Sequence, residues 1–572
     1  MYNGVILNAY PDSVGDNLSG ALAFLEENKL NQAFACVYLL PTIYNSDLDR
    51  GFSIVDYNLN SALVTKEDLQ KVSDLGIKLK LDIVLNHLSV AAPQFQDLLK
   101  NGDNSTYKDF FIDWNSFWEG NGVMDENGIA QPQKDFLKKL FMRKEGLPIL
   151  EVYFPDGTKR PYWNTFYQKV TFNEIHPADL GDVLSSEEEK VSISRKINDA
   201  IAKGINPQEI DFPMSSNKKQ EILNIVYSKC AYLGQMDLNA NSELVWDFYQ
   251  DCLKKLSGYG CTILRLDAFA YLHKKVGETN FFNSPGTWEY LARFRTMADT
   301  HNLTLLPEIH AEYGAKIHEE VAQKGYMIYD FFLPGLIIYS IEFCDNIPLV
   351  KWVTELMDKA YKTVNMLGCH DGIPMLDLKG KTIDGVYHEG LLSDNQIDDV
   401  ISLILDRGGI VKNLFDSKGK KVSYYQVNAT YFSALGENEK KLLLARAIQL
   451  FVPGIPQVWY LDLFAGKNDY DAVALSGSGG HKEINRTNLS LDTVTKALET
   501  DSVKQQLELI KLRNKLDAFS GKLTLTCSDE KSMVFTWKKG DEFATLEANL
   551  STLRFCVSYS ENGKLNRTVY NL

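Results

Sequence analysis

The chain of 572 residues carries 75 acidic and 60 basic side chains, which gives a net charge of −15 at pH 7. This excess of negative charge argues against nucleic acid or an anionic membrane surface as a partner. No apolar run approaches the roughly 20 residues that span a bilayer, and the first residues lack the basic and apolar parts of a secretion signal. The eight cysteines have no paired spacing, so reduced thiols and a cytoplasmic protein are expected.

With 45% hydrophobic residues, the chain can bury a large core, divided over roughly two to four domains. Short apolar segments alternate with helical segments, one of which covers 66–75 and ends before Gly76, where a glycine cap is expected. Eight apolar segments are expected to be strands: 5–9, 36–41, 79–87, 263–269, 305–310, 327–332, 364–371 and 457–460. This alternation predicts an α/β fold, the (β/α)8 TIM barrel, with inserted loop domains.

Two long intervals and the C-terminal part do not follow the alternation. Residues 88–240 are expected to form an inserted domain after the third strand, and residues 373–430 a second insertion after the seventh. The barrel would then comprise 1–87, 241–372 and 431–519. From 520 to 572 the apolar residues alternate with period two, which predicts a C-terminal antiparallel β domain.

The first insertion contains an extra helical segment at about 168–232. A capping sequence at 185–190 predicts a helix that ends near Gly204, and a second helix is expected over 217–231. A surface hairpin without a catalytic role is the favoured interpretation, and a lid or a dimer contact beside the functional site is the alternative. The glycine-rich residues 476–480 are expected to form a mobile loop.

One predicted strand, at 262–269, combines an apolar sequence with Arg265 and Asp267. Positions i and i+2 lie on the same face of a strand, so the guanidinium and the carboxylate are expected to pair. Pairing would lower the pKa of Asp267 and keep it ionised, which suits a nucleophile at the carboxyl end of a barrel strand. A purely structural ion pair is the alternative.

Polar side chains follow the other predicted strands at the corresponding point. Barrel enzymes carry their chemistry at the carboxyl ends of the strands. The polar residues at these ends are Asp47, Asp49, Arg50, Asn86, His87, Arg265, Asp267, Glu308, His310, His370 and Asp371. Three carboxylates, those of Asp267, Glu308 and Asp371, are therefore expected to meet at one mouth of the barrel.

Two carboxyl groups at one site are the minimum for cleaving a glycosidic bond. In the retaining mechanism one attacks the anomeric carbon, and the other donates a proton to the leaving oxygen. Asp267 suits the first role. Glu308 follows the apolar residues 305–307, which are expected to raise its pKa, as an acid requires. Asp371 would stabilise the cationic transition state or hold sugar hydroxyls together with two histidines.

Four short motifs resemble the signature regions of the α-amylase superfamily, glycoside hydrolase family 13. They lie at 82–87, 265–268, Glu308 and 370–371. Further motifs are most similar to those of sucrose phosphorylases and related α-glucosyl phosphorylases, and they extend over nearly the whole chain: 49–57, 306–310, 329–334, 370–373, 425–428, 451–457, 465–469 and 483–486. This resemblance implies that a glucosyl unit passes from sucrose to phosphate through a covalent β-glucosyl-enzyme.

The resemblance also implies roles for individual side chains. Asp267 would be the nucleophile, Glu308 the acid/base and Asp371 the transition-state stabiliser. The substrate-binding residues would be Asp49, Phe52, His87, Gln235, Arg265, Tyr271, His310, His370, Ser423, Gln426 and Arg486. Either Arg143 or Lys144 would bind phosphate. No cofactor is expected, because displacement at an anomeric carbon needs no electron sink; no metal is expected either, although related amylases often bind calcium near the position of Asn86.

One position departs from this family. Sucrose-specific relatives carry an aspartate in the acceptor loop where the chain has Ser423. The sequence therefore does not determine which leaving group is bound. Sucrose is the favoured donor, and glucosylglycerol, glucosylglycerate and sucrose 6-phosphate are alternatives. An α-glucoside hydrolase or transglucosidase would use the same carboxylates without phosphate. A non-catalytic scaffold ranks last because all three carboxylates are present. Small molecules are the only partners expected, for a monomer or a homodimer.

Overall fold

Eight parallel strands form the central sheet of the protein, in the order β14-β13-β5-β2-β1-β22-β16-β15. Their bounds are Ile6–Ala9 (β1), Cys36–Leu39 (β2), Lys78–Val84 (β5), Cys261–Asp267 (β13), Thr304–Pro307 (β14), Ile328–Asp330 (β15), Thr363–Met366 (β16) and Ile455–Trp459 (β22). The end strands β14 and β15 contact each other, so the sheet curls into a barrel. The fold is the (β/α)8 TIM barrel, and all eight predicted strands are confirmed.

The computed structural model describes residues 4–144, 146–154, 158–213, 215–415, 421–476, 480–561 and 563–570. Within 412–415 and 421–425 it describes the backbone alone. The loop expected at 476–480 falls largely outside the described residues. In the part of the chain that is described, no helix is long and apolar enough to cross a membrane.

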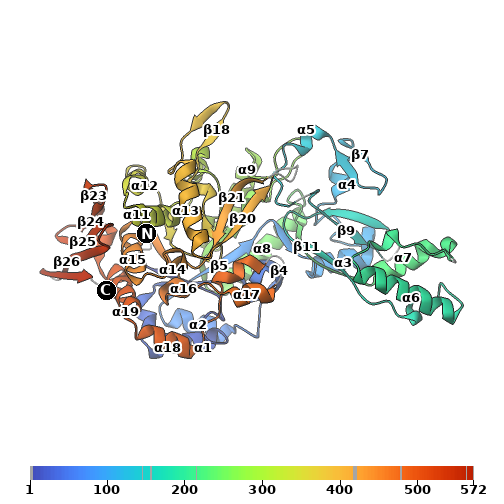
Figure 1. The fold of residues 1–572 in the computed structure, drawn as a ribbon, viewed down its shortest axis with the longest axis horizontal. Helices are drawn as coiled ribbons and strands as arrows, with labels where there is room; N and C mark the ends of the chain where they lie inside the picture. The colour runs from blue at the N-terminus through green and yellow to red at the C-terminus, as the bar shows by residue number, and fades with distance from the viewer. Residues whose placement is uncertain are drawn as a thin grey trace.

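Helices cover the outside of the barrel (Figure 1). Their buried apolar residues pack in one core with those of the strands. Helix α2 (Lys66–Asp74) begins at a capping box between Thr65 and Asp68 and buries Leu69. Gly76 follows the helix with a φ of +74°, a left-handed conformation that glycine adopts without strain. The other helices around the barrel include α1 (Leu18–Glu27), α8 (Glu243–Gly258), α9 (Gly286–Asp299), α10 (Ile317–Gln323), α11 (Leu333–Phe343), α12 (Ile347–Asp358), α15 (Glu439–Phe451) and α19 (Asp501–Lys515).

The chain leaves the barrel after β5 and returns along β12 (Cys230–Asp237). Strand β12 pairs antiparallel with β11 and with β6, so the insertion ends beside the place where it begins. This register sets Gln235 opposite Ser89 and Asp237 opposite His87 at the mouth of the barrel. The elements between are β6 (His87–Ser89), α3 (Pro93–Asn101), β7 (Gly122–Met124), β8 (Ala130–Pro132), β9 (Ile149–Tyr153), β10 (Lys159–Trp163) and β11 (Gln168–Phe172).

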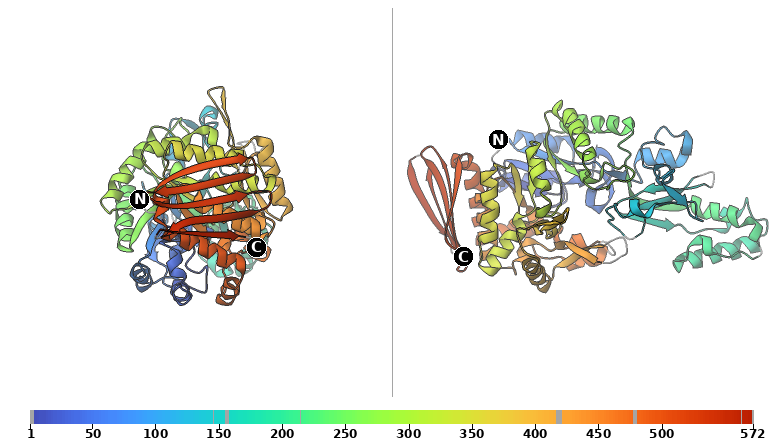
Figure 2. Two further views of the ribbon diagram at one scale, coloured as in Figure 1. Left: turned by 90° about the vertical axis from the view of Figure 1, so that its left-hand side faces the viewer. Right: turned by 90° about the horizontal axis from the view of Figure 1, so that it is seen from above.

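Two helices, α6 (Glu187–Ala202) and α7 (Lys219–Ser228), lie between β11 and β12, and both were expected from the sequence. Ser186 caps α6 by accepting a hydrogen bond from the backbone of Glu189. The pair has a small apolar core of its own, which includes Ile197. Figures 1 and 2 place the two helices at the end of the molecule farthest from the C-terminal sheet, as a surface hairpin would lie. A lid or dimer role stays a prediction.

The second insertion follows β16 and forms a three-stranded sheet of β17 (Ile373–Pro374), β21 (Lys421–Asn428) and β20 (Ile410–Phe415). It also contains the hairpin β18 (Lys381–Ile383) and β19 (Val386–His388) and the helix α13 (Asp394–Asp406). This sheet brings β21 beside the end of β16. The acceptor loop expected in this insertion therefore approaches the barrel mouth.

Five antiparallel strands form the C-terminal domain, which confirms the period-two prediction (Figure 2). They are β23 (Lys522–Asp529), β24 (Ser532–Lys539), β25 (Glu542–Asn549), β26 (Arg554–Glu561) and β27 (Lys564–Tyr570). Trp537 joins this sheet to the barrel, because its indole Nε1 donates to the carbonyl of Phe451 at 2.8 Å. The domain boundaries expected from the sequence stay predictions.

Candidate active site

The carboxyl end of β13 carries the first part of the site. Arg265 on this strand lies opposite Asp82 of β5 and two residues before Asp267. Ala268 follows with a φ of +51°, a left-handed conformation that turns the chain sharply out of the strand. Asp267 therefore stands at the mouth of the barrel.

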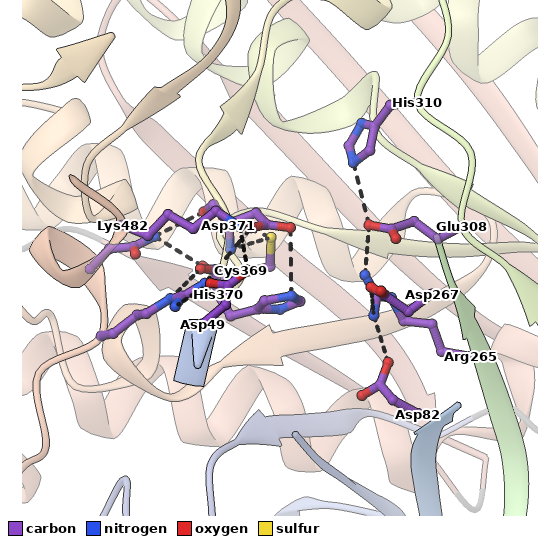
Figure 3. A network of polar contacts seen from close by, with 12 residues as sticks. Asp49, Asp82, Arg265, Asp267, Glu308, His310, Cys369, His370, Asp371 and Lys482 are labelled. Atoms are coloured by element: carbon purple, nitrogen blue, oxygen red, sulfur yellow. Dashed lines mark hydrogen bonds and ion pairs between the residues drawn. The ribbon is translucent and has the colours of Figure 1, made fainter. Parts of the chain in front are cut away.

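The guanidinium of Arg265 joins three carboxylates (Figure 3). Its Nη1 lies 2.6 Å from Oδ1 of Asp82 and 3.0 Å from Oδ1 of Asp267. Its Nη2 lies 2.6 Å from Oε1 of Glu308. The Arg265 side chain is 3% exposed, so these charges interact in a low-dielectric environment. One guanidinium thus contacts both carboxyl groups that the sequence predicts to be the nucleophile and the acid/base.

The pKa values of Asp267 and Glu308 run opposite to the directions expected from the sequence. Burial raises the pKa of Asp267 well above its usual range, and Arg265 offsets only part of that effect. Burial also acts on Glu308, but Arg265 and His310 lower its pKa to about 2. The prediction that an apolar strand end raises the Glu308 pKa is wrong, because Glu308 has the shorter contact with the guanidinium. Of these two carboxyls, Asp267 is therefore the one whose ionised form its surroundings disfavour more.

A second group of charges surrounds Asp371, apart from the group around Arg265 (Figure 3). The Nζ atom of Lys482 lies 2.6 Å from Oδ1 of Asp371 and 3.8 Å from Oδ2 of Asp49. Arg486 reaches the same two carboxylates, with Nη1 at 3.4 Å from Asp49 and Nη2 at 3.9 Å from Asp371. Burial opposes ionisation of Asp371, but these cations, Lys482 foremost, lower its pKa well below the usual range. Asp371 is therefore ionised.

Lys482 is the residue of this group that the sequence does not predict. It lies on the 3-10 helix η11 (Gly480–Asn485), outside every strand end of the barrel. The available signal is only its closeness in the sequence to Arg486, a predicted substrate-binding residue four positions later.

The backbone is strained where Asp49 enters the site. Asp49 has a φ of +48° and Arg50 a φ of +45°, both in the left-handed region that side chains other than glycine rarely adopt. Arg50 donates to the carbonyl of Arg486 and to Asn488, and these contacts hold the turn in place. Arg50 therefore fixes the position of Asp49 from outside the pocket.

The ring of Phe52 contacts residues of both charge groups. It stacks on His370 with 4.8 Å between ring centroids and an interplanar angle of 12°, and the Arg265 guanidinium lies 5.4 Å from its centroid. The Phe52 carbonyl accepts hydrogen bonds from Nε2 of His87 at 3.1 Å and Nε2 of Gln235 at 3.2 Å. Burial lowers the pKa of His87 to about 4 and that of His370 to about 3, so both imidazoles are neutral.

Arg143 lies beside Tyr271, which is expected to border the acceptor. Its Nη1 donates to the Tyr271 hydroxyl at 3.2 Å, and its guanidinium lies 5.5 Å from the centroid of Phe166. The Phe166 ring in turn lies 4.9 Å from that of His87. Lys144 instead donates to Asn164, and burial lowers its pKa to about 8. Of the two phosphate-binding candidates, Arg143 is the one that contacts a predicted substrate-binding residue, Tyr271.

The remaining predicted acceptor residues come from two elements. His310 follows β14 and lies 3.5 Å from Glu308. Gln426 on β21 is buried beside Gly372, where a Cβ atom would come within 2.9 Å of the Gln426 Cβ. Glycine after Asp371 therefore permits this close approach. Ser423 pairs with Leu414 in the backbone register of β21 and β20, and its side chain lies outside the described part of the chain.

An ammonium group occupies the surroundings of Asn86, the position near which related amylases bind calcium. The Nζ atom of Lys274 donates to Oδ1 of Asn86 at 2.8 Å and to the carbonyl of Tyr271 at 2.7 Å. It also lies 2.8 Å from Oδ2 of Asp237, and both charged side chains are almost fully buried. A calcium ion would need these same oxygens, so the residues present do not fit one.

One group of side chains among the described residues is close enough to hold a metal ion, that of His318, Glu319 and Glu355. Lys359 lies 2.8 Å from Glu319 and 3.7 Å from Glu355. The ammonium of Lys359 therefore already pairs with the carboxylates of this group.

Comparison with known proteins identifies the family. Residues 26–138 match the model of the alpha amylase catalytic domain. A sucrose 6(F)-phosphate phosphorylase of Ilumatobacter coccineus is 51% identical over 561 residues, which span 98% of this chain and 96% of that protein. The chain belongs to the family of sucrose and sucrose 6F-phosphate phosphorylases. The resemblance stated from its motifs is thereby confirmed.

Other members of this phosphorylase family match the chain over nearly its whole length. A sucrose 6(F)-phosphate phosphorylase of Thermoanaerobacterium thermosaccharolyticum is 31% identical and is matched over 98% of both chains. The crystal structure of the sucrose 6F-phosphate phosphorylase from Thermoanaerobacter thermosaccharolyticum superposes with a TM-score of 0.79 at 29% identity, over 100% of this chain and 98% of that one. The barrel, its insertions and the C-terminal sheet of this phosphorylase-family chain therefore have counterparts in a solved structure.

Proposed function

We propose that the chain is a retaining α-glucosyl phosphorylase that cleaves sucrose 6F-phosphate with inorganic phosphate. The products would be α-glucose 1-phosphate and fructose 6-phosphate. The observation that carries the proposal is the contact of both Asp267 and Glu308 with Arg265. Two carboxyls at one site, with a third carboxylate ionised across from them, suit double displacement at an anomeric carbon.

In the first step the Asp267 carboxylate attacks the anomeric carbon and Glu308 protonates the leaving oxygen. This requires the proton on Glu308, whereas Arg265 and His310 favour the ionised form of Glu308 and burial favours the neutral form of Asp267. A donor whose glycosidic oxygen occupies the place beside Glu308 would separate that carboxyl from Arg265. The guanidinium would then stabilise ionised Asp267, and the proton would move to Glu308. Phe52 and Asp371 would face the positive charge that develops on the sugar ring.

In the second step phosphate replaces water as the nucleophile. A phosphate oxygen forms a bond to the anomeric carbon, the ester bond to Asp267 breaks with its electron pair returning to the carboxylate, and Glu308 accepts the phosphate proton. An anion that approaches a carboxylate needs cations nearby. Arg143 supplies one on the acceptor side, where it contacts Tyr271.

Two observations favour sucrose 6F-phosphate over sucrose as the donor. Ser423 stands where sucrose-specific relatives carry an aspartate, so a phosphorylated fructose would meet no carboxylate at that position. A relative with 51% identity carries the name of that substrate. Sucrose, the donor favoured from the motifs alone, is the second candidate, because sucrose phosphorylases are also among the relatives.

The test is a reverse-direction screen. Purified protein and α-glucose 1-phosphate are offered fructose 6-phosphate, fructose, glycerol or glycerate in separate tubes, and phosphate release is followed. Release that is fastest with fructose 6-phosphate supports the proposal, and fastest release with fructose would assign sucrose instead. Equal slow release in every tube, including buffer alone, would mean hydrolysis and would refute a phosphorylase.

We also propose that the enzyme acts in the cytoplasm, as a monomer or a homodimer, on small molecules alone. Its donor and products are charged sugar phosphates, which do not cross a bilayer unaided. Size-exclusion chromatography with light scattering would decide the oligomeric state.

A further inference from the structure

His310 is held from three sides beside the acid/base carboxyl. Its ring stacks on Phe331 with 3.8 Å between centroids, and its Nδ1 lies 3.3 Å from both carboxylate oxygens of Asp377. Its Nε2 lies 3.5 Å from Oε1 of Glu308, the contact drawn in Figure 3. The Asp377 side chain is 2% exposed and comes from the 3-10 helix η10 (Leu376–Leu378) of the second insertion.

This geometry favours a charged imidazole. Nδ1 lies within hydrogen-bond distance of the Asp377 carboxylate and Nε2 lies 3.5 Å from Glu308, and only the imidazolium carries an N–H on both ring nitrogens. Burial alone would lower the pKa of His310, but Asp377 and Glu308 outweigh it and raise the pKa to about 9. The other charged groups nearby are Arg265, which contacts Glu308, and Glu312, which lies on the Asp377 side. His310 is therefore a cation at neutral pH, unlike His87 and His370.

We propose that Asp377 is a positioning residue that keeps His310 protonated, so that the pocket offers the incoming phosphate a fixed cation beside Glu308. This inference rests on the phosphorylase function proposed above and adds the group that selects phosphate over water. In the second step an oxyanion must approach the Glu308 carboxylate, which repels it. An imidazolium between Asp377 and Glu308 offsets that repulsion, and its ring cannot turn away while Nδ1 is held.

Water, the competing nucleophile, is neutral and needs no such cation. Loss of the His310 charge should therefore slow attack by phosphate much more than attack by water. A merely structural role of Asp377 would reduce both reactions alike, because both use the same glucosyl-enzyme. The ratio of phosphorolysis to hydrolysis separates the two interpretations.

The first experiment compares Asp377→Asn with wild type. The amide keeps the shape and can accept the Nδ1 proton, but it carries no charge. We expect the KM for phosphate to rise about tenfold or more, with hydrolysis of the donor in the absence of phosphate changing less than about twofold. Between pH 7.5 and 9.5 phosphate is a dianion, so the loss of kcat/KM for phosphate near pH 9 in wild type would report His310 and should move to lower pH in the variant.

Glu355→Gln is the matched control. Glu355 contacts another buried histidine, with 3.4 Å between Nε2 of His318 and a carboxylate oxygen, but it lies outside the catalytic groups described above. The control should leave the ratio of phosphorolysis to hydrolysis unchanged. Equal losses of both reactions in Asp377→Asn, with an unmoved pH profile, would overturn the proposal.

A second measurement does not depend on turnover. The chain has nine histidines, and labelling their Cε1 positions with ¹³C lets each be titrated by NMR, with His310 assigned from its absence in His310→Gln. We expect a His310 titration midpoint above pH 8 in wild type. A midpoint below pH 7 would refute the proposal even if phosphorolysis is found. Absence of phosphorolysis in wild type would instead refute the proposed function, whatever the titration gives.

Discussion

The Nη2 atom of Arg265 lies 2.6 Å from Oε1 of Glu308, closer than Nη1 lies to Asp267 at 3.0 Å. The guanidinium therefore favours the ionised form of Glu308, the carboxyl proposed above as the proton donor. In the proposed mechanism, the glycosidic oxygen of the donor would separate Glu308 from Arg265, so that Glu308 takes the proton and Asp267 becomes the ionised nucleophile.

The first prediction concerns the nucleophile. Asp267→Asn should lower kcat for every glucosyl donor by about 10⁴-fold or more, because no covalent intermediate can form. Initial rates of phosphate release from α-glucose 1-phosphate measure this directly. Asp47→Asn is the matched control, since this strand-end carboxylate accepts a hydrogen bond from Ser89 at the exposed rim. Wild-type rates in Asp267→Asn would remove Asp267 from its assigned role.

The second prediction concerns the proton donor. Glu308→Gln should slow cleavage of sugar leaving groups by about 10²-fold to 10⁴-fold, which is the usual contribution of general acid catalysis. Donors such as α-glucosyl fluoride leave without protonation, so the first step on them should be nearly spared. Pre-steady-state release of fluoride measures that step. Equal losses on both kinds of donor would mean that Glu308 is not the acid.

The third prediction concerns Lys482, which neutralises Asp371 and approaches Asp49. In Lys482→Met the Asp371 carboxylate loses its shortest charged contact. Losing a charge-assisted contact costs about 1.5–3 kcal/mol, so kcat/KM for the donor should fall by roughly 10- to 100-fold. Lys482→Arg should recover much of the loss. Lys467→Met removes an exposed lysine that pairs with Glu437 and serves as the control. Unchanged kcat/KM in Lys482→Met would show that the contact has no part in turnover.

The sequence predicted what strand periodicity and motifs encode. All eight barrel strands were located, because apolar segments of the right length alternate with helices, and the three carboxylates follow strand ends at which a barrel collects its chemistry. Lys482 and Asp377 were missed. Both lie on short 3-10 helices away from the ends of the barrel strands, so strand periodicity does not indicate where their side chains point.

The order of the carboxyl pKa values could not be predicted for a related reason. Alternate positions on β13 gave the pairing of Arg265 with Asp267, which the structure contains. The stronger contact, to Glu308, joins residues 43 positions apart on neighbouring strands and depends on which guanidinium nitrogen faces which strand. Sequence order carries no information on that choice.

The fourth prediction concerns pH and stability. Burial lowers the pKa of His87 to about 4 in the folded protein, against about 6.5 in an unfolded chain. Between these values the unfolded chain binds a proton that the folded protein does not, so stability falls as the pH decreases. At pH 5 this group should cost about 2 kcal/mol relative to pH 7.

His87→Gln tests this sign. The free energy of unfolding is measured by urea titration at pH 7, 6 and 5 for wild type and variant. The advantage of wild type over the variant should shrink by about 2 kcal/mol between pH 7 and pH 5. A difference that is constant over this range would contradict a neutral, buried His87.

The fifth prediction concerns the ammonium of Lys274, which holds Asn86 at the end of β5 and Asp237 at the end of β12. Burial works against ionisation of Asp237, and Lys274 lowers its pKa below the usual value. In Lys274→Met that carboxylate is left buried without its cation, which typically costs about 3–5 kcal/mol. The midpoint of the first urea unfolding transition should fall accordingly. Lys275→Met, which changes the adjacent exposed lysine, should leave it unchanged.

The double variant Lys274→Met/Asp237→Asn separates the lost cation from the lost packing. If the cost arises from an unpaired buried charge, removing that charge as well should restore much of the unfolding midpoint. Because β12 also carries Gln235 to the carbonyl of Phe52, the single variant should raise the KM for the donor, and the double variant should bring it back toward wild type. A double variant no more stable than Lys274→Met would mean that the charge of the ammonium does not matter. The stability of the junction between the barrel and its first insertion would then come from the apolar contacts around Lys274.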